Sequence, residues 1–111
     1  MSAEDVANAF VHHFYTTFDS GNVAALASLY QPQSSLSFEG SPFTGAEAII
    51  QKYSSLGPVV HDIAGLTKEV QMSVNAQSML IFVTGKLIIG GPTGNPLLFA
   101  QCFQLVAVGP G

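Results

Sequence analysis

Arginine and tryptophan are missing from this 111-residue sequence, and charged residues of every kind are scarce. The basic residues are three lysines, and seven acidic residues give a formal net charge of −4. A nucleic-acid-binding protein needs clustered lysine and arginine side chains to neutralise phosphates. A helix that lies on an anionic membrane needs a basic face. The composition therefore argues against nucleic acid as a partner and against a basic membrane-surface helix.

Cysteine occurs once, at Cys102, so the chain cannot form an internal disulfide. Cys102 stands in an apolar segment, and we expect it to be a buried packing residue rather than a nucleophile. His12 and His13 are neighbours, and no histidine follows either of them at i+4, so a helical metal site is not expected. We predict no metal, no cofactor and no catalytic residue.

Targeting and membrane-spanning segments are also not apparent. The N-terminal residues lack the basic stretch and apolar core of a signal peptide. The most apolar segment, 79–91, is too short to span a bilayer and contains Lys86, so membrane insertion is not expected. Hydrophobic residues make up 48% of the chain against 9% charged residues. The length fits a single domain over 1–111, and its surface must be partly apolar, which favours contact with another subunit or partner.

A helical pattern dominates the first twenty residues. Apolar residues recur every three to four positions from Val6 to Phe18, which predicts one helix with Ser2 as its N-cap and Gly21 as its stop. A shorter helix is expected over 22–30, before the segment QPQSS interrupts it.

A third helix is expected from about Gly45 to Ser54, because Thr44 and Glu47 fit the capping-box pattern. The pair Gly57-Pro58 should end it. The short segment LSFE at 36–39 is strand-like, and a run of strands follows the third helix. These later strands are expected at 59–67, 68–74, 78–89 and 97–108, with turns at 75–77 and 90–96. Three helices followed by a run of strands predict an α+β fold with an antiparallel sheet covered by helices on one face.

In the segment 78–89 both alternating sets of residues are apolar. An antiparallel sheet usually has one face in contact with water. We expect the helices to cover one face and a second copy of the chain to cover the other. Met79, Ile81 and Val83 are the expected residues of this homodimer interface.

Acidic residues are few enough to consider singly. Glu47 is explained by the capping box, and Asp19 is expected to have a capping or loop role at a helix end. Asp62 follows His61 in one strand, so their side chains point to opposite faces and do not form a dyad. His61 is either a buried packing residue or a rim residue that meets a partner. Glu39 has no such local explanation.

Several segments together resemble the nuclear transport factor 2 family. These are FYTTFD at 14–19, LSFEG at 36–40, and the helix pattern G-x-x-x-I-x-x-K-x-x-x-L, in which the lysine is Lys52 and the last residue Leu56. Their order and spacing match the family from Val6 to Leu105. The resemblance implies a cone-shaped, cystatin-like α+β fold, with three helices packed in a strongly bent antiparallel sheet and homodimers formed through the outer sheet face.

The resemblance also implies carriage rather than catalysis. Family members bind the GDP form of the small GTPase Ran and the Phe-Gly repeats of nucleoporins, and they import Ran into the nucleus. The implied locations are the cytoplasm, the nucleus and the nuclear pore or envelope. In the family an aromatic side chain of Ran enters the hollow of the cone, and a rim carboxylate pairs with a basic residue of Ran. The residues that match the family's Ran-binding positions are Phe38, Glu39, Leu56, Val59, Val60 and His61.

Three features depart from the family pattern. The loop 90–96 carries none of the acids that many members have there, and Ala3 replaces an aromatic that contacts nucleoporin repeats in some members. The family also continues past the segment QCFQL into one more strand, so we expect an unpaired sheet edge here. A scaffold or adaptor domain of the same fold stays open as an alternative function. An enzyme that uses the cone as its pocket would need an acid or a Tyr–Asp pair deep in the cone, and the sequence offers no clear candidate.

Overall fold

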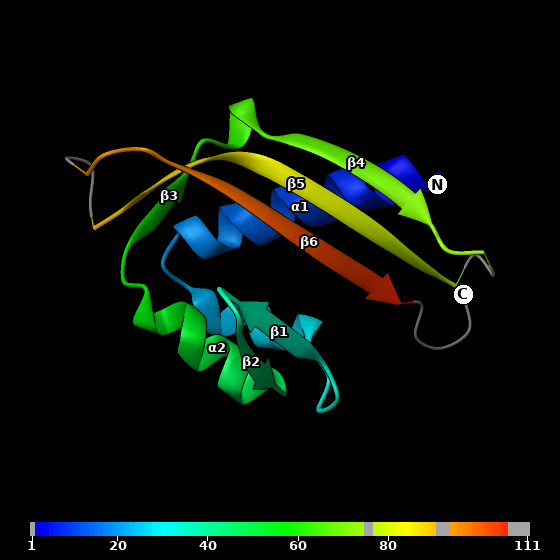
Figure 1. Cartoon of the computed structure of the whole chain (residues 1–111), viewed down its shortest axis with the longest axis horizontal. Helices are drawn as coiled ribbons and strands as arrows, with labels where there is room; N and C mark the ends of the chain where they lie inside the picture. Colours follow the sequence, from blue (N-terminus) through cyan, green and yellow to red (C-terminus); the bar gives the residue numbers. More distant parts are fainter. Residues whose placement is uncertain (1, 75–76, 91–93, 107–111) are drawn as a thin grey trace.

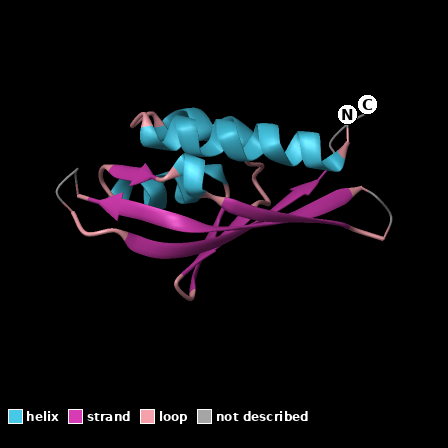
Figure 2. Cartoon of the chain, turned by 90° about the horizontal axis from the view of Figure 1, so that it is seen from above, coloured by secondary structure: helices cyan, strands magenta, loops and turns pink. Residues whose placement is uncertain are grey.

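Helices cover one face of an antiparallel sheet in the computed structural model, which describes residues 2–74, 77–90 and 94–106 (Figures 1 and 2). Helix α1 spans Ala3–Asp19 and begins with a capping box. The Ser2 hydroxyl accepts a hydrogen bond from the Asp5 amide at 3.1 Å, and the Asp5 carboxylate accepts one from the Ser2 amide. The predicted cap and the predicted apolar stripe are confirmed, because Phe14, Tyr15 and Phe18 are buried.

The second and third helices differ from the prediction in detail. Residues Val23–Leu29 form a 3-10 helix, η1, rather than an α-helix, and no side chain caps its start. Helix α2 spans Ala46–Ser55, and its N-cap is Gly45 rather than Thr44. The predicted Thr44–Glu47 capping box is therefore wrong, because Thr44 belongs to a strand and is paired with Ser35. Gly45 has φ +89°, and this glycine conformation turns the extended chain into the helix.

Two short strands before α2 form a separate hairpin. Strand β1 is Ser35–Phe38, one residue earlier than the segment predicted at 36–39, and β2 is Ser41–Thr44, which the sequence did not predict. They pair antiparallel with Phe38 opposite Ser41, which leaves Glu39 and Gly40 as a two-residue turn. The hairpin lies beside α2 (Figure 1), and among the described residues it pairs with no strand of the larger sheet.

The larger sheet is built around one long strand, β5, at Ser78–Ile89. Strand β6, Leu97–Val106, pairs with β5 on one side. Strands β3, Val59–His61, and β4, Thr67–Met72, pair with two different parts of its other side. The strand predicted at 59–67 is interrupted by a second 3-10 turn, η2, at Ile63–Gly65. The interruption is necessary because residues 62–66 lie opposite only Gly85 and Lys86 and must leave the sheet.

The core lies between α1 and the inner face of this sheet. Ile81 and Val83 are 0% exposed, and Phe103 of β6 packs edge-on against Phe14 with ring centroids 4.9 Å apart. The interface prediction is therefore wrong for Ile81 and Val83, because they are core residues beneath the helices, and Met79 packs against the same core. Period-two alternation places their neighbours Leu80 and Phe82 on the outer face, where both are exposed.

The outer face of the sheet is largely apolar. We use this name for the side opposite α1, where the exposed large apolar residues are Val60, Leu80, Phe82, Leu98 and Val106. Cys102 lies there too and is exposed, so its predicted burial is wrong. Alternation explains the error, because its neighbour Phe103 takes the inward position. No helix in the described part of the chain has the length and hydropathy that a membrane crossing requires.

Candidate functional site

A cavity of about 690 Å³ lies between the β1–β2 hairpin, α2 and the inner face of the sheet. It exists because α1 covers only part of that face, and because the hairpin pairs with no strand of the larger sheet among the described residues. Its lining is mainly apolar and aromatic, with polar groups from a few residues. The apolar and aromatic lining includes Phe14, Phe18, Phe38, Tyr53, Leu56, Val59, Leu87, Ile89 and Leu97.

The rim of the cavity carries Phe38 and Glu39, as the family resemblance implied. Glu39 has φ +49° and Gly40 has φ +88°. Positive φ at both positions of a two-residue hairpin turn is the type I′ combination, which asparagine and glycine favour. Glu39 is exposed at the apex of this turn. Its carboxylate has no ion-pair partner among the residues that the structure describes.

Leu56 and Val59 also line the cavity, and His61 lies deeper in it. Val60 does not, because strand alternation turns it to the outer face, where it is 51% exposed. The placement of Val60 at the cavity is therefore wrong. The structure brings together the other five residues that match the family's Ran-binding positions.

His61 is fixed by a carboxylate that the sequence reasoning did not connect with it. The Asp19 Oδ1 atom lies 2.6 Å from His61 Nδ1, and Asp19 Oδ2 accepts a hydrogen bond from the His61 backbone amide at 2.6 Å. Both side chains are largely buried. A carboxylate can only accept hydrogen bonds, so Nδ1 carries a hydrogen and the imidazole orientation is set. His61 is a satisfied buried residue and, at the same time, part of the cavity wall.

One signal for this pair was present in the sequence. Asp19 is the last residue of α1, and the last turn of that helix contains no basic residue. A negative charge at a helix C-terminus is unfavourable because of the helix dipole. Such a residue needs a compensating partner, and here His61, 42 positions further on, provides it.

Three tyrosines have buried or partly buried side chains, and one of them, Tyr53, lines the cavity. The Tyr15 hydroxyl donates to Gln101 Oε1 at 2.7 Å, and the hydroxyls of Tyr30 and Tyr53 are 2.8 Å apart. Burial is the largest cause that raises the pKa of Tyr15, Tyr30 and Tyr53 above the ordinary value. These groups therefore stay protonated near neutral pH and act as neutral hydrogen-bond partners. We find no activated nucleophile among them.

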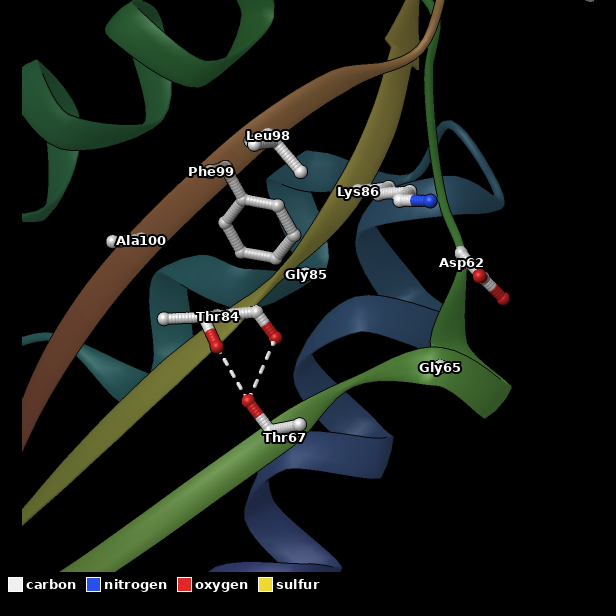
Figure 3. Close-up of a pocket in the computed structure, with 9 residues that line it drawn as sticks. All are labelled: Asp62, Gly65, Thr67, Thr84, Gly85, Lys86, Leu98, Phe99 and Ala100. Atoms are coloured by element: carbon white, nitrogen blue, oxygen red, sulfur yellow. Dashed lines mark hydrogen bonds between the residues drawn. The ribbon is translucent and has the colours of Figure 1, made fainter.

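A second hollow, of about 710 Å³, lies over Gly85 where the chain leaves the sheet between β3 and β4. Figure 3 shows it with α1 behind the strands, and the Thr67 and Thr84 hydroxyls are hydrogen-bonded to each other. Its rim carries Asp62 and Lys86. Among the described residues no group of three or more histidine, cysteine or acidic side chains could hold a metal ion. This hollow opens on the outer face, and Leu98, Phe99 and Ala100 of β6 line both it and the cavity on the inner face.

A cavity enclosed by the inner face of the sheet, the helices and the β1–β2 hairpin is typical of the cone-shaped, cystatin-like α+β class, and the protein has this arrangement. The sequence matches the family model described as Nuclear transport factor 2 (NTF2) domain over residues 6–111. The chain belongs to the nuclear transport factor 2 family. The family recognition and the fold class predicted from the sequence are thereby confirmed.

Individual relatives agree with this assignment. A protein from Oryza sativa subsp. japonica named Nuclear transport factor 2 is 49% identical over 111 residues, covering 98% of this chain and 88% of the relative. A solved structure of nuclear transport factor 2 from Cryptosporidium parvum is 36% identical, with a TM-score of 0.76 over 90% of this chain and 77% of that one. A putative scytalone dehydratase from Novosphingobium aromaticivorans gives a TM-score of 0.73 at 13% identity, over 92% and 72% of the two chains. That likeness extends to the fold alone.

Proposed function

We propose that this protein is a nucleocytoplasmic transport factor that binds the GDP form of Ran at the cavity and carries it into the nucleus. The observation that carries the proposal is the unpaired carboxylate of Glu39 beside an apolar cavity. Relatives that the chain matches over nearly its whole length bear the name of this transport factor. The proposal assigns carriage, with no catalytic residue and no cofactor.

The cavity suits an aromatic anchor on the partner. An aromatic side chain buries roughly 150–250 Å² and prefers edge-on contacts with other rings. Phe14, Phe18 and Tyr53 offer such contacts in the wall, and Leu56 and Val59 add aliphatic surface. His61, held by Asp19, offers a polar contact at depth.

Glu39 supplies the specificity at the rim. A basic side chain of the partner would form a charge-assisted contact with it, in a geometry that also requires the aromatic anchor to enter the cavity. Among the described residues that line the cavity, Glu39 is the one acid, and the sequence of the loop 90–96 contains none. Partner binding at this site therefore depends on Glu39 more than it would in a relative with an acidic loop.

The remaining partners follow from the same assignment. We propose a homodimer through the outer face, where exposed apolar residues such as Leu80 and Phe82 would be covered by the second copy. We also propose contact with the Phe-Gly repeats of nucleoporins, and residence in the cytoplasm, the nucleus and the nuclear pore. The protein is expected neither to bind nucleic acid nor to insert into a membrane.

A titration with Ran in both nucleotide states tests the proposal. The parent chain should bind Ran-GDP well and Ran-GTP weakly. Glu39→Lys should abolish binding, because repulsion replaces attraction across the interface, at a cost of several kcal/mol. The same change should alter stability by no more than about 0.5 kcal/mol, because Glu39 is exposed and unpaired. Equal affinity for both nucleotide states, or a Glu39→Lys protein that binds as the parent does, would contradict the proposal.

A second candidate is a scaffold or adaptor domain that binds other proteins through the same cavity. The loop 90–96, which has no acid, favours this candidate. If the parent shows no affinity for Ran in either state while it still assembles as a dimer, the adaptor function replaces the carrier function.

A further inference from the structure

Lys52 contacts two aromatic rings of the β1–β2 hairpin, and one of them, that of Phe38, lines the cavity. It lies in the last turn of α2 and is half-buried. Its ammonium group is 4.7 Å from the centroid of the Phe38 ring and 5.8 Å from that of the Phe43 ring. Both distances fall within the range of about 6 Å in which a cation is attracted to the face of an aromatic ring.

These two rings come from different strands of one hairpin. Phe38 ends β1, and Phe43 lies in β2, where it is paired with Leu36. The hairpin has no strand neighbour in the larger sheet among the described residues, so backbone pairing does not attach it there. Side chains must hold it against the body of the protein, and Lys52 connects both of its strands to α2.

The Lys52 ammonium contacts aromatic rings and not a carboxylate. In the described part of the chain the one contact at ion-pair distance is between His61 and Asp19, and Lys52 pairs with neither Glu39 nor any other acid there. Glu39 immediately follows Phe38 and starts the turn. A salt bridge between Lys52 and Glu39 would neutralise the rim carboxylate, whereas the observed arrangement leaves it available.

We propose that Lys52 is a positioning residue of the partner-binding rim. Its ammonium holds the Phe38 ring in place, and through it the Glu39–Gly40 turn, so that the apolar rim and the carboxylate face a partner in one fixed arrangement. This inference rests on the proposed function where it concerns Ran-GDP. Its effect on the hairpin of the free protein is independent of the partner.

Loss of the Lys52 charge should change the affinity for the partner in opposite directions, depending on whether Lys52 acts by simple electrostatics or by positioning the rim. If Glu39 meets a basic residue, removal of a nearby positive charge by Lys52→Met should strengthen binding slightly. If Lys52 positions the rim, the same substitution should weaken binding, because the partner must then order the hairpin. Methionine keeps a long unbranched side chain, so the packing of the lysine stem is largely preserved.

The experiment compares the parent with Lys52→Met, Lys52→Arg and the matched control Lys68→Met. Lys68 is exposed on β4, and its replacement changes the net charge by the same amount. In the free proteins, amide hydrogen exchange of residues 38–41 should be several-fold faster in Lys52→Met than in the parent. It should be unchanged in Lys68→Met and restored in Lys52→Arg, whose guanidinium also stacks on aromatic faces.

Titration with Ran-GDP provides the second measurement. Lys52→Met should lose about threefold to tenfold in affinity, the range that a partly exposed cation–ring contact provides. Lys52→Arg and Lys68→Met should stay within about twofold of the parent. If Lys52→Met fails to give the circular dichroism spectrum of the parent, Lys52→Gln replaces it in both measurements.

Two results would overturn the inference. One is hairpin exchange in Lys52→Met that equals the parent rate, and the other is Ran-GDP binding that is unchanged or tighter. A parent that does not bind Ran-GDP would refute the proposed function instead. In that case faster exchange at residues 38–41 would still support the role of Lys52 in the hairpin, and unchanged exchange would still refute it.

Discussion

At the scale of single residues, the most informative position is Glu39. Its φ of +49° puts an ordinary L-residue in the left-handed region, at a turn position that asparagine or glycine would occupy more easily. Residues in unfavourable backbone conformations cluster at functional sites, where their side chains take part in binding or catalysis. In the proposed function, the exposed carboxylate of Glu39 binds a basic side chain of the partner at the cavity rim.

Replacement of Glu39 by asparagine should therefore stabilise the free protein while it weakens binding. The left-handed conformation costs most L-residues roughly 1–2 kcal/mol, and asparagine recovers part of this. Urea unfolding should show a gain of up to about 1 kcal/mol. Affinity for Ran-GDP should fall about tenfold to hundredfold, because a charge-assisted hydrogen bond is lost. A variant that is both less stable than the parent and equally tight in binding would refute this reading of Glu39.

The Asp19–His61 pair gives a second prediction at this scale. Asp19→Ala would leave the His61 amide and Nδ1 without their partner in a largely buried site. Each unsatisfied buried group costs about 1–3 kcal/mol, so the free energy of unfolding should fall by about 2–4 kcal/mol. Asp62→Ala is the matched control, because Asp62 is exposed, and it should change stability by less than about 0.5 kcal/mol. Similar losses in the two variants would contradict this role for Asp19.

At the scale of helices and strands, local sequence patterns predicted most elements, but they did not predict which elements contact each other. The period of apolar residues located α1, and apolar runs between turn signals located the long strands. Helix α2 was located by a capping-box pattern that the structure does not contain. Strand β2 was not predicted, because its sequence SPFT contains a proline and reads as a turn. The exposed face of β5 was misassigned, because both alternating sets are apolar and a pattern with period two does not say which set faces the helices.

The cavity could be predicted only in part. The rim residues Phe38 and Glu39 were identified through the family resemblance, and local chemistry alone marked only Glu39. The contact between Asp19 and His61 depends on how α1 crosses β3, which no local pattern encodes. The contacts of Lys52 could not be predicted either. Its position near the end of a helix suggests a solvent-exposed side chain, whereas in the structure it contacts two aromatic rings.

Buried tyrosines that connect elements give a prediction on pH. Tyr15 links α1 to β6, and Tyr30 links the chain after η1 to α2. Their pKa values are raised above 10.0 by burial, so the folded chain keeps these protons where the unfolded chain loses them. The folded state then binds more protons, and stability must fall as the pH rises through about 10.

The expected loss is up to about 1.4 kcal/mol per pH unit for each buried tyrosine above pH 10. Urea unfolding between pH 8 and pH 11 measures it. Tyr53→Phe should reduce the slope, because one raised pKa is removed. A stability that stays constant across this pH range would show that the tyrosines titrate alike in the folded and unfolded chains.

At the scale of the whole molecule, the apolar outer face is the surface on which the proposed homodimer depends. Phe82 is 48% exposed and Leu98 82% exposed on the face that carries the exposed Cys102. Along the described residues, β6 pairs with β5 alone, so this face also ends at an open strand edge. A second copy packed on the outer face would remove these apolar side chains from water.

Thiol labelling should report this contact. In the proposed homodimer Cys102 should react with a maleimide much more slowly than in the unfolded chain. Phe82→Glu places a charge in the interface and should give a monomer by light scattering, with Cys102 labelled rapidly. A parent that is monomeric at micromolar concentration, or whose thiol reacts as fast as that of Phe82→Glu, would contradict a dimer through this face.

The most direct measurement for the whole molecule is the mapping of Ran-GDP onto this chain by NMR. Amide signals of Phe38, Glu39, Leu56 and His61 should shift on addition of Ran-GDP and stay in place on addition of Ran-GTP. Signals from the outer face, such as those of Leu80 and Phe82, should not respond, because in the proposed homodimer the second copy covers that face. If the shifts appear on the outer face instead, or if neither nucleotide form perturbs the cavity, then the cavity is not the Ran-binding site.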